Sequence, residues 1–227
     1  MKIFGIEHIL YLLISLIYFT IISILLKKYI KDENKINIMF KIIGLIGLIL
    51  IILNRIALSI RDNNFILLIP DSYCGMTSLL ISISLLFFKK DNYILHALWL
   101  IGIIGDLLSI IYPGFISNSP SIFYFPTITS FLHHTYTLFS IILIFIFKYI
   151  NLDLKKSWVQ IIAFIFYIII GLILVYGFNI NEAYYIKEPI LKNTPLNIWL
   201  LLPIYTIIYL SIMIPLTIYK RNKRNTQ

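Results

Sequence analysis

Ionisable side chains interrupt the apolar stretches of this chain at a few positions, and their types can support covalent catalysis. The sequence contains one cysteine, Cys74, and a histidine doublet, His133-His134. A cysteine acts as a nucleophile when a base and water can reach its thiol. Cys74 with His133 or His134 is therefore the predicted catalytic pair, and a thiol that only packs within a helix is the alternative. Because neighbouring helical positions diverge by about 100°, we expect one histidine to face the site and the other to face a loop or lipid.

Two carboxylates, those of Asp71 and Asp106, can serve this pair in either of two ways. One of them can orient the histidine, or both can join it in holding a metal. A zinc site usually has three or four ligands, which His8, one histidine of the doublet, Asp71 and Asp106 would supply. No ligand spacing along the chain fixes such a site, so the leading prediction contains neither a metal nor another cofactor.

Two arginine residues indicate recognition of an anion. Arg55 lies within an apolar stretch, and Arg61 lies at its end. Guanidinium groups bind phosphate and carboxylate in bidentate fashion. For Arg55, a structural ion pair with Asp106 or Asp62 is the alternative. The predicted substrate-binding set is Arg55, Arg61, Asp71, Glu7 and His8, although Glu7 and His8 also fit a solvated helix start.

The composition identifies the solvent in which these residues must work. The chain has 227 residues, of which 60% are hydrophobic, and its mean hydropathy is +0.93. A soluble domain of this size cannot bury so much apolar surface, so the sequence predicts an integral membrane protein. The net charge of +9 would suggest a nucleic-acid partner in a soluble protein. Here the basic residues lie in short loops between apolar stretches, so we expect no nucleic acid.

Seven apolar stretches approach the length of about 20 residues that crosses a bilayer. They predict helices at residues 9–26, 36–59, 73–88, 93–112, 127–147, 158–176 and 196–219. The predicted fold is therefore all-α: a polytopic integral membrane protein with a single domain, residues 1–227, that forms a seven-transmembrane-helix bundle.

Loop charges predict how the bundle is oriented. Thirteen Lys and Arg residues lie on one side of the predicted bundle and four on the other. The positive-inside rule then predicts an outer N-terminus and a cytoplasmic C-terminus, in a multi-pass protein of the cell membrane. With this threading the polar residues named above gather near the outer face. Polar groups inside a membrane are costly, so such a cluster indicates a functional site. The uncharged aromatic loop 113–126 would cover it as a lid, or would serve only as a connector.

Short motifs in the first two thirds of the chain resemble the YwaF-like family of bacterial membrane proteins, which is related to eukaryotic transmembrane protein 164. One motif is Ile69-Pro70-Asp71-Ser72-Tyr73-Cys74, which keeps the family's Pro and Cys but has Ser72 at the family's histidine position. Others are the fourth stretch, with Gly102, Gly105 and Pro113, and the segment Phe131-Leu132-His133-His134. The resemblance covers about residues 1–147 and is expected to fade beyond them. It places the chain in the bacterial plasma membrane.

The resemblance implies a lipid acyltransferase. Carried over to this sequence, Cys74 would take the acyl group as a thioester, and His134 or His133 would act first as general base and then as general acid. The partners would be a phospholipid acyl donor and a lipid acceptor at the outer leaflet. Because Ser72 replaces the family's histidine, the substrate, and whether the protein is active at all, can differ from those of the family.

Two other classes of function remain open from the residues alone. A metal-dependent membrane lipid hydrolase would use the His and Asp set described above. A small-solute transporter or receptor would use the polar cluster for binding, although the sequence has neither an inverted repeat nor paired broken helices of the kind that transporters show.

Overall fold

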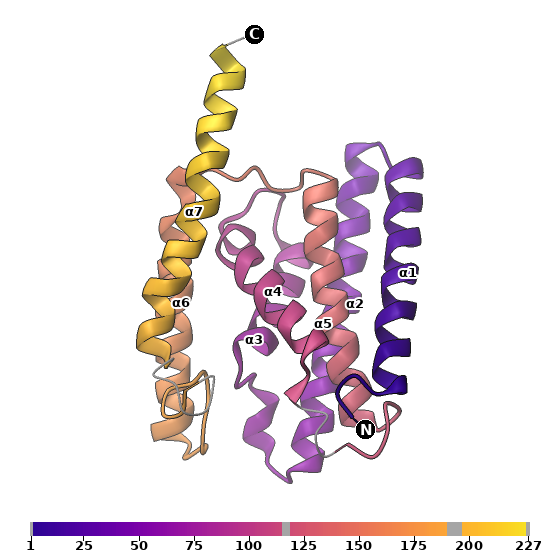
Figure 1. The fold of residues 1–227 in the computed structure, drawn as a ribbon, viewed down its shortest axis with the longest axis vertical. Coiled ribbons are helices and arrows are strands. Elements are labelled where there is room, and N and C mark those ends of the chain that lie inside the picture. Colours follow the sequence, from indigo (N-terminus) through magenta and orange to yellow (C-terminus); the bar gives the residue numbers. More distant parts are fainter. Residues whose placement is uncertain (1, 115–118, 190–196, 226–227) are drawn as a thin grey trace. The chain divides into compact units, whose positions relative to one another are not determined.

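The computed structural model describes residues 2–114, 119–189 and 197–225, and most of these residues lie in helices (Figure 1). The seven α-helices are α1 (Ile6–Tyr29), α2 (Glu33–Arg61), α3 (Tyr73–Phe87), α4 (Tyr93–Ile111), α5 (Phe125–Ile146), α6 (Trp158–Leu172) and α7 (Ile198–Asn225). Short turns are η1 (Phe65–Leu68), η3 (Leu154–Lys156) and η4 (Ile173–Gly177), of which η4 is a π-type turn that continues α6.

Each predicted stretch corresponds to one of these helices. In the described residues, six helical segments are long and apolar enough to cross a membrane, where α6 counts together with η3 and η4 as Leu154–Gly177, so the protein is a multi-pass membrane protein. The exception is α3, whose 15 residues span about 22 Å, less than the roughly 30 Å hydrocarbon core. The count of seven crossings and the orientation of the termini therefore stay predictions. The predicted start of the last helix at residue 196, and residues 115–118 of the suggested lid loop, lie outside the described residues.

The chain forms two compact units, and the candidate site belongs to the first of them. That unit comprises Met1–Asn92 and Ile101–Ile150, so α4 contributes only its later turns to it. Within it α2 packs against α3 and α5, and α1 packs against α5. The α1–α5 contact includes a hydrogen bond of 2.6 Å between the hydroxyls of Tyr11 and Thr135, and a stacked pair, Phe19 and Phe139.

The second unit comprises Tyr93–Leu100 and Asn151–Gln227. Its buried polar contacts centre on His96, whose Nε2 lies 3.1 Å from Nζ of Lys156. Gln160 donates to the carbonyl of His96 and accepts from the hydroxyl of Tyr205. His96 therefore has a packing role among α4, α6 and α7, and it lies outside the predicted site.

Small residues let α2 and α3 approach closely. A Cβ added to Gly44 would lie 2.7 Å from the backbone nitrogen of Leu86 and 2.7 Å from the carbonyl oxygen of Ser82. One turn later, a Cβ at Gly47 would lie 2.5 Å from Oγ of Ser82. Small residues at such crossings are how membrane helices bring their backbones together. This contact fixes α3, and thus Cys74, against α2.

The variant Gly44→Ala should be less stable than the native protein by about 1–3 kcal/mol, because the new methyl group meets backbone that cannot move aside cheaply. Thermal melting of the detergent-purified protein measures this. The matched control is Gly177→Ala, whose Cβ meets its nearest neighbour at 3.8 Å, an ordinary contact. A Gly44→Ala protein that melts as high as this control would contradict the close α2–α3 packing.

Candidate functional site

Cys74 lies in the first turn of α3, where the chain enters the helix from an extended segment. The N-cap is Ser72, whose Oγ accepts a hydrogen bond of 3.3 Å from the backbone N–H of Gly75. The thiol of Cys74 lies 3.5 Å from the hydroxyl of Ser109, which comes from α4. The positive dipole end of a helix N-terminus favours negative charge close to it.

His134 and Asp106 form a buried pair that joins α5 to α4. Nδ1 of His134 lies 2.7 Å from Oδ1 of Asp106. Asp106 is 0% exposed, and its second oxygen, Oδ2, has no hydrogen-bond partner among the residues that the structure describes. The carboxylate thus holds the imidazole through one oxygen and leaves the other without a bond.

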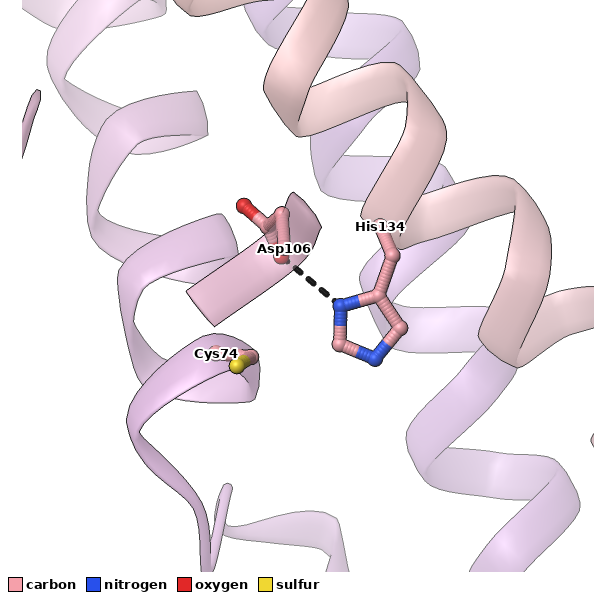
Figure 2. A group of neighbouring side chains, drawn as sticks. All are labelled: Cys74, Asp106 and His134. Carbon is pink, nitrogen blue, oxygen red and sulfur yellow. Dashed lines mark hydrogen bonds and ion pairs between the residues drawn. The ribbon is translucent and has the colours of Figure 1, made fainter. Parts of the chain in front are cut away.

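Cys74 completes this group, as Figure 2 shows, with one residue from each of α3, α4 and α5. One ligand-type atom from each of Cys74, Asp106 and His134 lies within 4.8 Å of the other two. The predicted cysteine and one of the predicted histidines are therefore together, with a carboxylate to orient the ring. A thiol, an imidazole and a carboxylate are the three groups that nucleophilic catalysis by cysteine combines.

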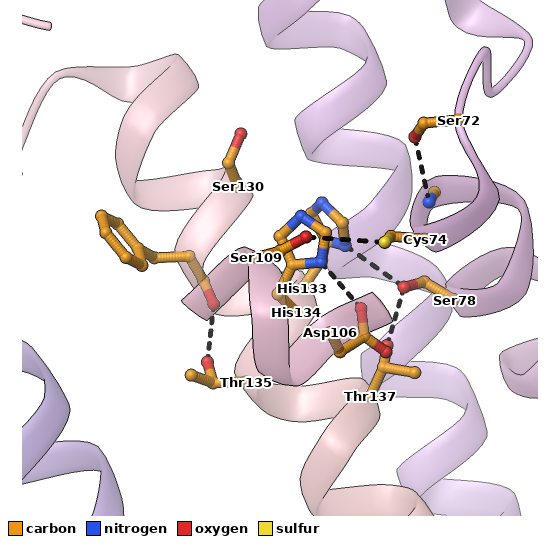
Figure 3. A network of polar contacts seen from close by, with 12 residues as sticks. Ser72, Cys74, Ser78, Asp106, Ser109, Ser130, His133, His134, Thr135 and Thr137 are labelled. Carbon is orange, nitrogen blue, oxygen red and sulfur yellow. Dashed lines mark hydrogen bonds and ion pairs between the residues drawn. The ribbon is translucent and has the colours of Figure 1, made fainter. Parts of the chain in front are cut away.

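His133 also faces inward, so the expectation that one histidine of the doublet turns to a loop or to lipid is wrong. Both rings are buried, and their centroids are 3.9 Å apart. Nδ1 of His133 lies 3.2 Å from Oγ of Ser78, which itself accepts a hydrogen bond from Thr137 (Figure 3). The reason is that α5 is enclosed over a wide sector, so two directions about 100° apart both point into protein.

Three hydroxyl residues of this network were not singled out from the sequence: Ser78, Ser109 and Thr137. Ser78 lies four residues after Cys74, and Ser109 lies three residues after Asp106. These spacings place each serine on the same helix face as its partner. Helical spacing measured from Cys74 and Asp106 would therefore have identified both serines. Serine and threonine are too common in membrane helices to indicate a site by themselves.

Arg55 forms its ion pair with Asp71, not with Asp106 or Asp62. The two side chains meet at 2.7 Å through Nη1 and Oδ1, and Arg55 is only 6% exposed. Its Nε has no hydrogen-bond partner in the described part of the chain. The neighbouring Asn54 is tied to α5 by a bond of 2.8 Å to Oγ of Ser130. The guanidinium is thus held in place by Asp71, and its Nε–H remains without a bond to the described residues.

A cavity of about 510 Å³ connects this arginine with the histidine doublet. Its walls are mostly polar and come from α2, α5 and the loops beside them. The lining residues are Asn54, Arg55, Leu58, Arg61, Asp62, Ser72, Gly114, Ser119, Tyr124, Ser130, His133 and His134. Arg55 and His134 therefore border the same space, as expected for groups that handle one ligand.

The remaining predicted site residues lie at the margin of the cavity or outside it. Arg61 borders it and donates two bonds of 2.7 Å to Asp62. This hydrogen bonding lowers the pKa of the Asp62 carboxyl. Glu7 and His8 do not line it. Glu7 accepts a bond from the backbone N–H of Ile122, whereas Nδ1 of His8 accepts from Phe4 and its Nε2 therefore donates to the carbonyl of Ile110. These last contacts anchor the start of α1.

Gly105 provides the space that Cys74 occupies. A Cβ at this glycine would lie 2.8 Å from the thiol sulfur. Gly105→Ala should therefore displace the thiol and slow its alkylation by a maleimide by about tenfold. This is a smaller effect than the roughly 10²-fold loss of rate that a displacement of about 1 Å causes at a reacting centre. Because Cys74 is the one cysteine of the chain, labelling followed by mass spectrometry reads this residue alone. Gly177→Ala again serves as the control, and equal alkylation rates in the two variants would contradict the contact.

The comparison with protein families gives a match over nearly the whole chain. The model of the TMEM164 family matches residues 3–219, almost the whole chain. The expectation that the resemblance fades after about residue 147 is therefore wrong, because the match includes α6 and most of α7. No curated protein and no solved structure matches the chain.

Proposed function

We propose that this chain, which belongs to the TMEM164 family, is a membrane-embedded acyltransferase that moves acyl chains between lipids through a thioester on Cys74. The observation that supports this most is the grouping of Cys74, His134 and Asp106 within 4.8 Å of one another. A thiol in a membrane helix needs no imidazole–carboxylate pair in order to pack. An imidazole oriented by a carboxylate is required if the thiol must lose a proton to a base.

The proposed reaction has two half-reactions that return the enzyme to its starting state. In the first, His134 takes the proton of the Cys74 thiol, and the sulfur attacks the ester carbonyl carbon of a phospholipid. A carbon–sulfur bond forms, the carbon–oxygen ester bond breaks, and the lysolipid leaves with the proton from His134. In the second, the hydroxyl of an acceptor lipid attacks the thioester and gives its proton to His134. A new carbon–oxygen ester bond forms, the carbon–sulfur bond breaks, and His134 returns the proton to the sulfur.

Asp106 has the positioning role in this scheme. Its bond of 2.7 Å to Nδ1 of His134 favours the tautomer in which Nδ1 carries the hydrogen, so that Nε2 is the basic nitrogen. The imidazolium that forms during each half-reaction is stabilised by the carboxylate. For the proton to move, the sulfur must come within hydrogen-bond reach of Nε2, and such contacts commonly tighten only when substrate is bound.

The cavity is the proposed lipid-headgroup site. Arg55 borders the cavity and is held there by Asp71, so its guanidinium is placed to bind a phosphate oxygen. Arg61 borders the same space and can add a second contact. In the predicted topology, with seven crossings, an outer N-terminus and a cytoplasmic C-terminus, this cavity belongs to the outer leaflet.

The two other classes of function have less support. The metal-dependent hydrolase was predicted to use His8 and Asp71 as ligands, but His8 anchors α1 and Asp71 pairs with Arg55. A solute transporter or receptor would use the cavity for binding, but it leaves the grouping of thiol, imidazole and carboxylate without a purpose.

Purified protein in vesicles tests the proposal directly. The vesicles contain a phospholipid with a deuterated acyl chain and an unlabelled lysophospholipid acceptor. Acyltransfer predicts deuterated product phospholipid and an equal amount of new lysolipid, with little free fatty acid. Release of deuterated fatty acid without transfer would show a hydrolase instead, and an unchanged lipid composition would contradict an enzyme acting on these lipids.

A further inference from the structure

We propose that Cys74, Asp106 and His134 also bind one divalent transition-metal ion, for which zinc is the best match, and that this ion inhibits the chemistry of Cys74. The binding half of this proposal depends only on the cluster itself. The inhibition half rests on the proposed acyltransfer.

The three side chains provide a donor set typical of zinc. They offer a sulfur, an imidazole nitrogen and a carboxylate oxygen, which are the ligand types that zinc takes in proteins. Three protein ligands with a fourth position left open is the arrangement of zinc sites that remain accessible. Hard ions such as magnesium prefer oxygen ligands alone, so the sulfur of Cys74 disfavours them.

The distances are close to those that an ion requires. Bonds of about 2.0 Å to nitrogen and oxygen and about 2.3 Å to sulfur place tetrahedral ligands roughly 3.3–3.6 Å apart. One ligand-type atom of each residue lies within 4.8 Å of those of the other two, so closure around an ion needs movements of up to about 1.5 Å. Cys74 can supply part of it, because its side chain has one rotatable bond and lies in the first turn of α3.

An independent feature of Asp106 points to a cation. Its Oδ2 is buried without a hydrogen-bond partner among the described residues, although the side chain is 0% exposed. Buried carboxylates are normally paired on both oxygens or coordinate metals. Oδ1 already binds His134, and the acyltransfer scheme uses only that oxygen. A metal would give Oδ2 a partner.

The charges that face the cluster allow a cation to reach it. His134 borders the cavity of about 510 Å³, which gives the ion a polar route. Two cationic groups border this cavity, Arg55 and Arg61, and each is neutralised by an ion pair, with Asp71 and Asp62 respectively. The two arginine–aspartate pairs therefore add no net positive charge that would repel a cation entering through the cavity.

Metal binding would remove the nucleophile from use. A thiolate that donates its electron pair to zinc attacks a carbonyl carbon or a maleimide slowly. The ion would also hold His134 away from its role as base. Zinc should thus inhibit acyl transfer and protect Cys74 from alkylation over the same concentration range.

Cobalt(II) is the probe for the site, because a sulfur ligand gives it a near-ultraviolet charge-transfer band. The full-length protein is stripped with a chelator and titrated with cobalt chloride. We expect one equivalent to bind with this band, Cys74→Ala to lose the band, and Asp106→Asn to weaken binding at least tenfold. The control Glu33→Gln, which removes an exposed carboxylate paired with Lys90 outside the cavity, should bind cobalt as the native protein does. Absence of the band in native protein, or a band that persists in Cys74→Ala, would overturn the proposal.

A second measurement needs no variant and therefore does not depend on the folding of one. Zinc chloride should slow maleimide alkylation of Cys74 in native protein at least tenfold, and removal of the zinc by chelator should restore the rate. Equal rates with and without zinc would overturn the site. Neither result affects the thioester mechanism, because acylation of Cys74 is measured separately in metal-free protein.

Discussion

Replacing Cys74 with alanine should reduce acyl transfer at least about 10³-fold, because the variant has no atom on which to form the acyl intermediate. Losses of this order or larger follow removal of the nucleophile from a nucleophile–base–acid group. The measurement is the initial rate of deuterated product phospholipid in vesicles. Cys74 lies against Ser109 and Gly105, and alanine is smaller, so the thermal melt should show a folded protein.

Ser109→Ala is the matched control for this variant. It removes a hydroxyl that lies 3.5 Å from the same sulfur but leaves the nucleophile and base in place. Because the loss of one neutral hydrogen bond costs about 0.5–1.5 kcal/mol, we expect a rate within about tenfold of the native protein. If Cys74→Ala keeps the native rate, a role for the thiol as nucleophile is excluded.

Asp106→Asn should lower kcat about 10²–10⁴-fold with little change in KM. The asparagine side chain is nearly isosteric, so packing around α4 is retained. Its amide can donate to Nδ1 of His134, which would place the ring hydrogen on Nε2 and remove the basic nitrogen. The steady-state kinetics of acyl transfer separate the two constants, and the melt establishes that the variant is folded.

Asp71→Asn changes another carboxylate of the first unit, one that is partly exposed, and is expected to behave differently. Asp71 pairs with Arg55 at the cavity, so its loss should act mainly on lipid binding and raise KM. Two variants with the same pattern of kcat and KM would mean that Asp106 does not act through His134.

The helices were predictable from the sequence because apolar length in a membrane protein is a strong and local signal. The predicted stretch at 36–59 became α2 (Glu33–Arg61), and that at 127–147 became α5 (Phe125–Ile146). The ends moved by a few residues where caps extend the helices, as Asp32 does by accepting from the N–H of Lys35 at the start of α2. Cys74 and His134 were identifiable for a related reason, since polar groups are rare in such stretches.

The pairing of polar residues was not predictable, because it depends on how helices rotate against one another. Arg55 was expected to meet Asp106 or Asp62, but it meets Asp71, which approaches from the loop before α3. His8 and Glu7 were expected at the site, yet their bonds go to backbone groups of residues far along the chain. No periodicity in a sequence indicates a bond to the carbonyl of Ile110.

Intact-protein mass spectrometry tests the central claim most directly. Metal-free native protein is incubated with phospholipid vesicles, and its mass is measured before and after treatment with neutral hydroxylamine, which cleaves thioesters. The account predicts one added acyl mass, located on Cys74, that hydroxylamine removes and that His134→Ala forms far more slowly. Transfer of deuterated acyl chains without any adduct on Cys74, or an adduct that resists hydroxylamine, would contradict a thioester on Cys74 as the intermediate.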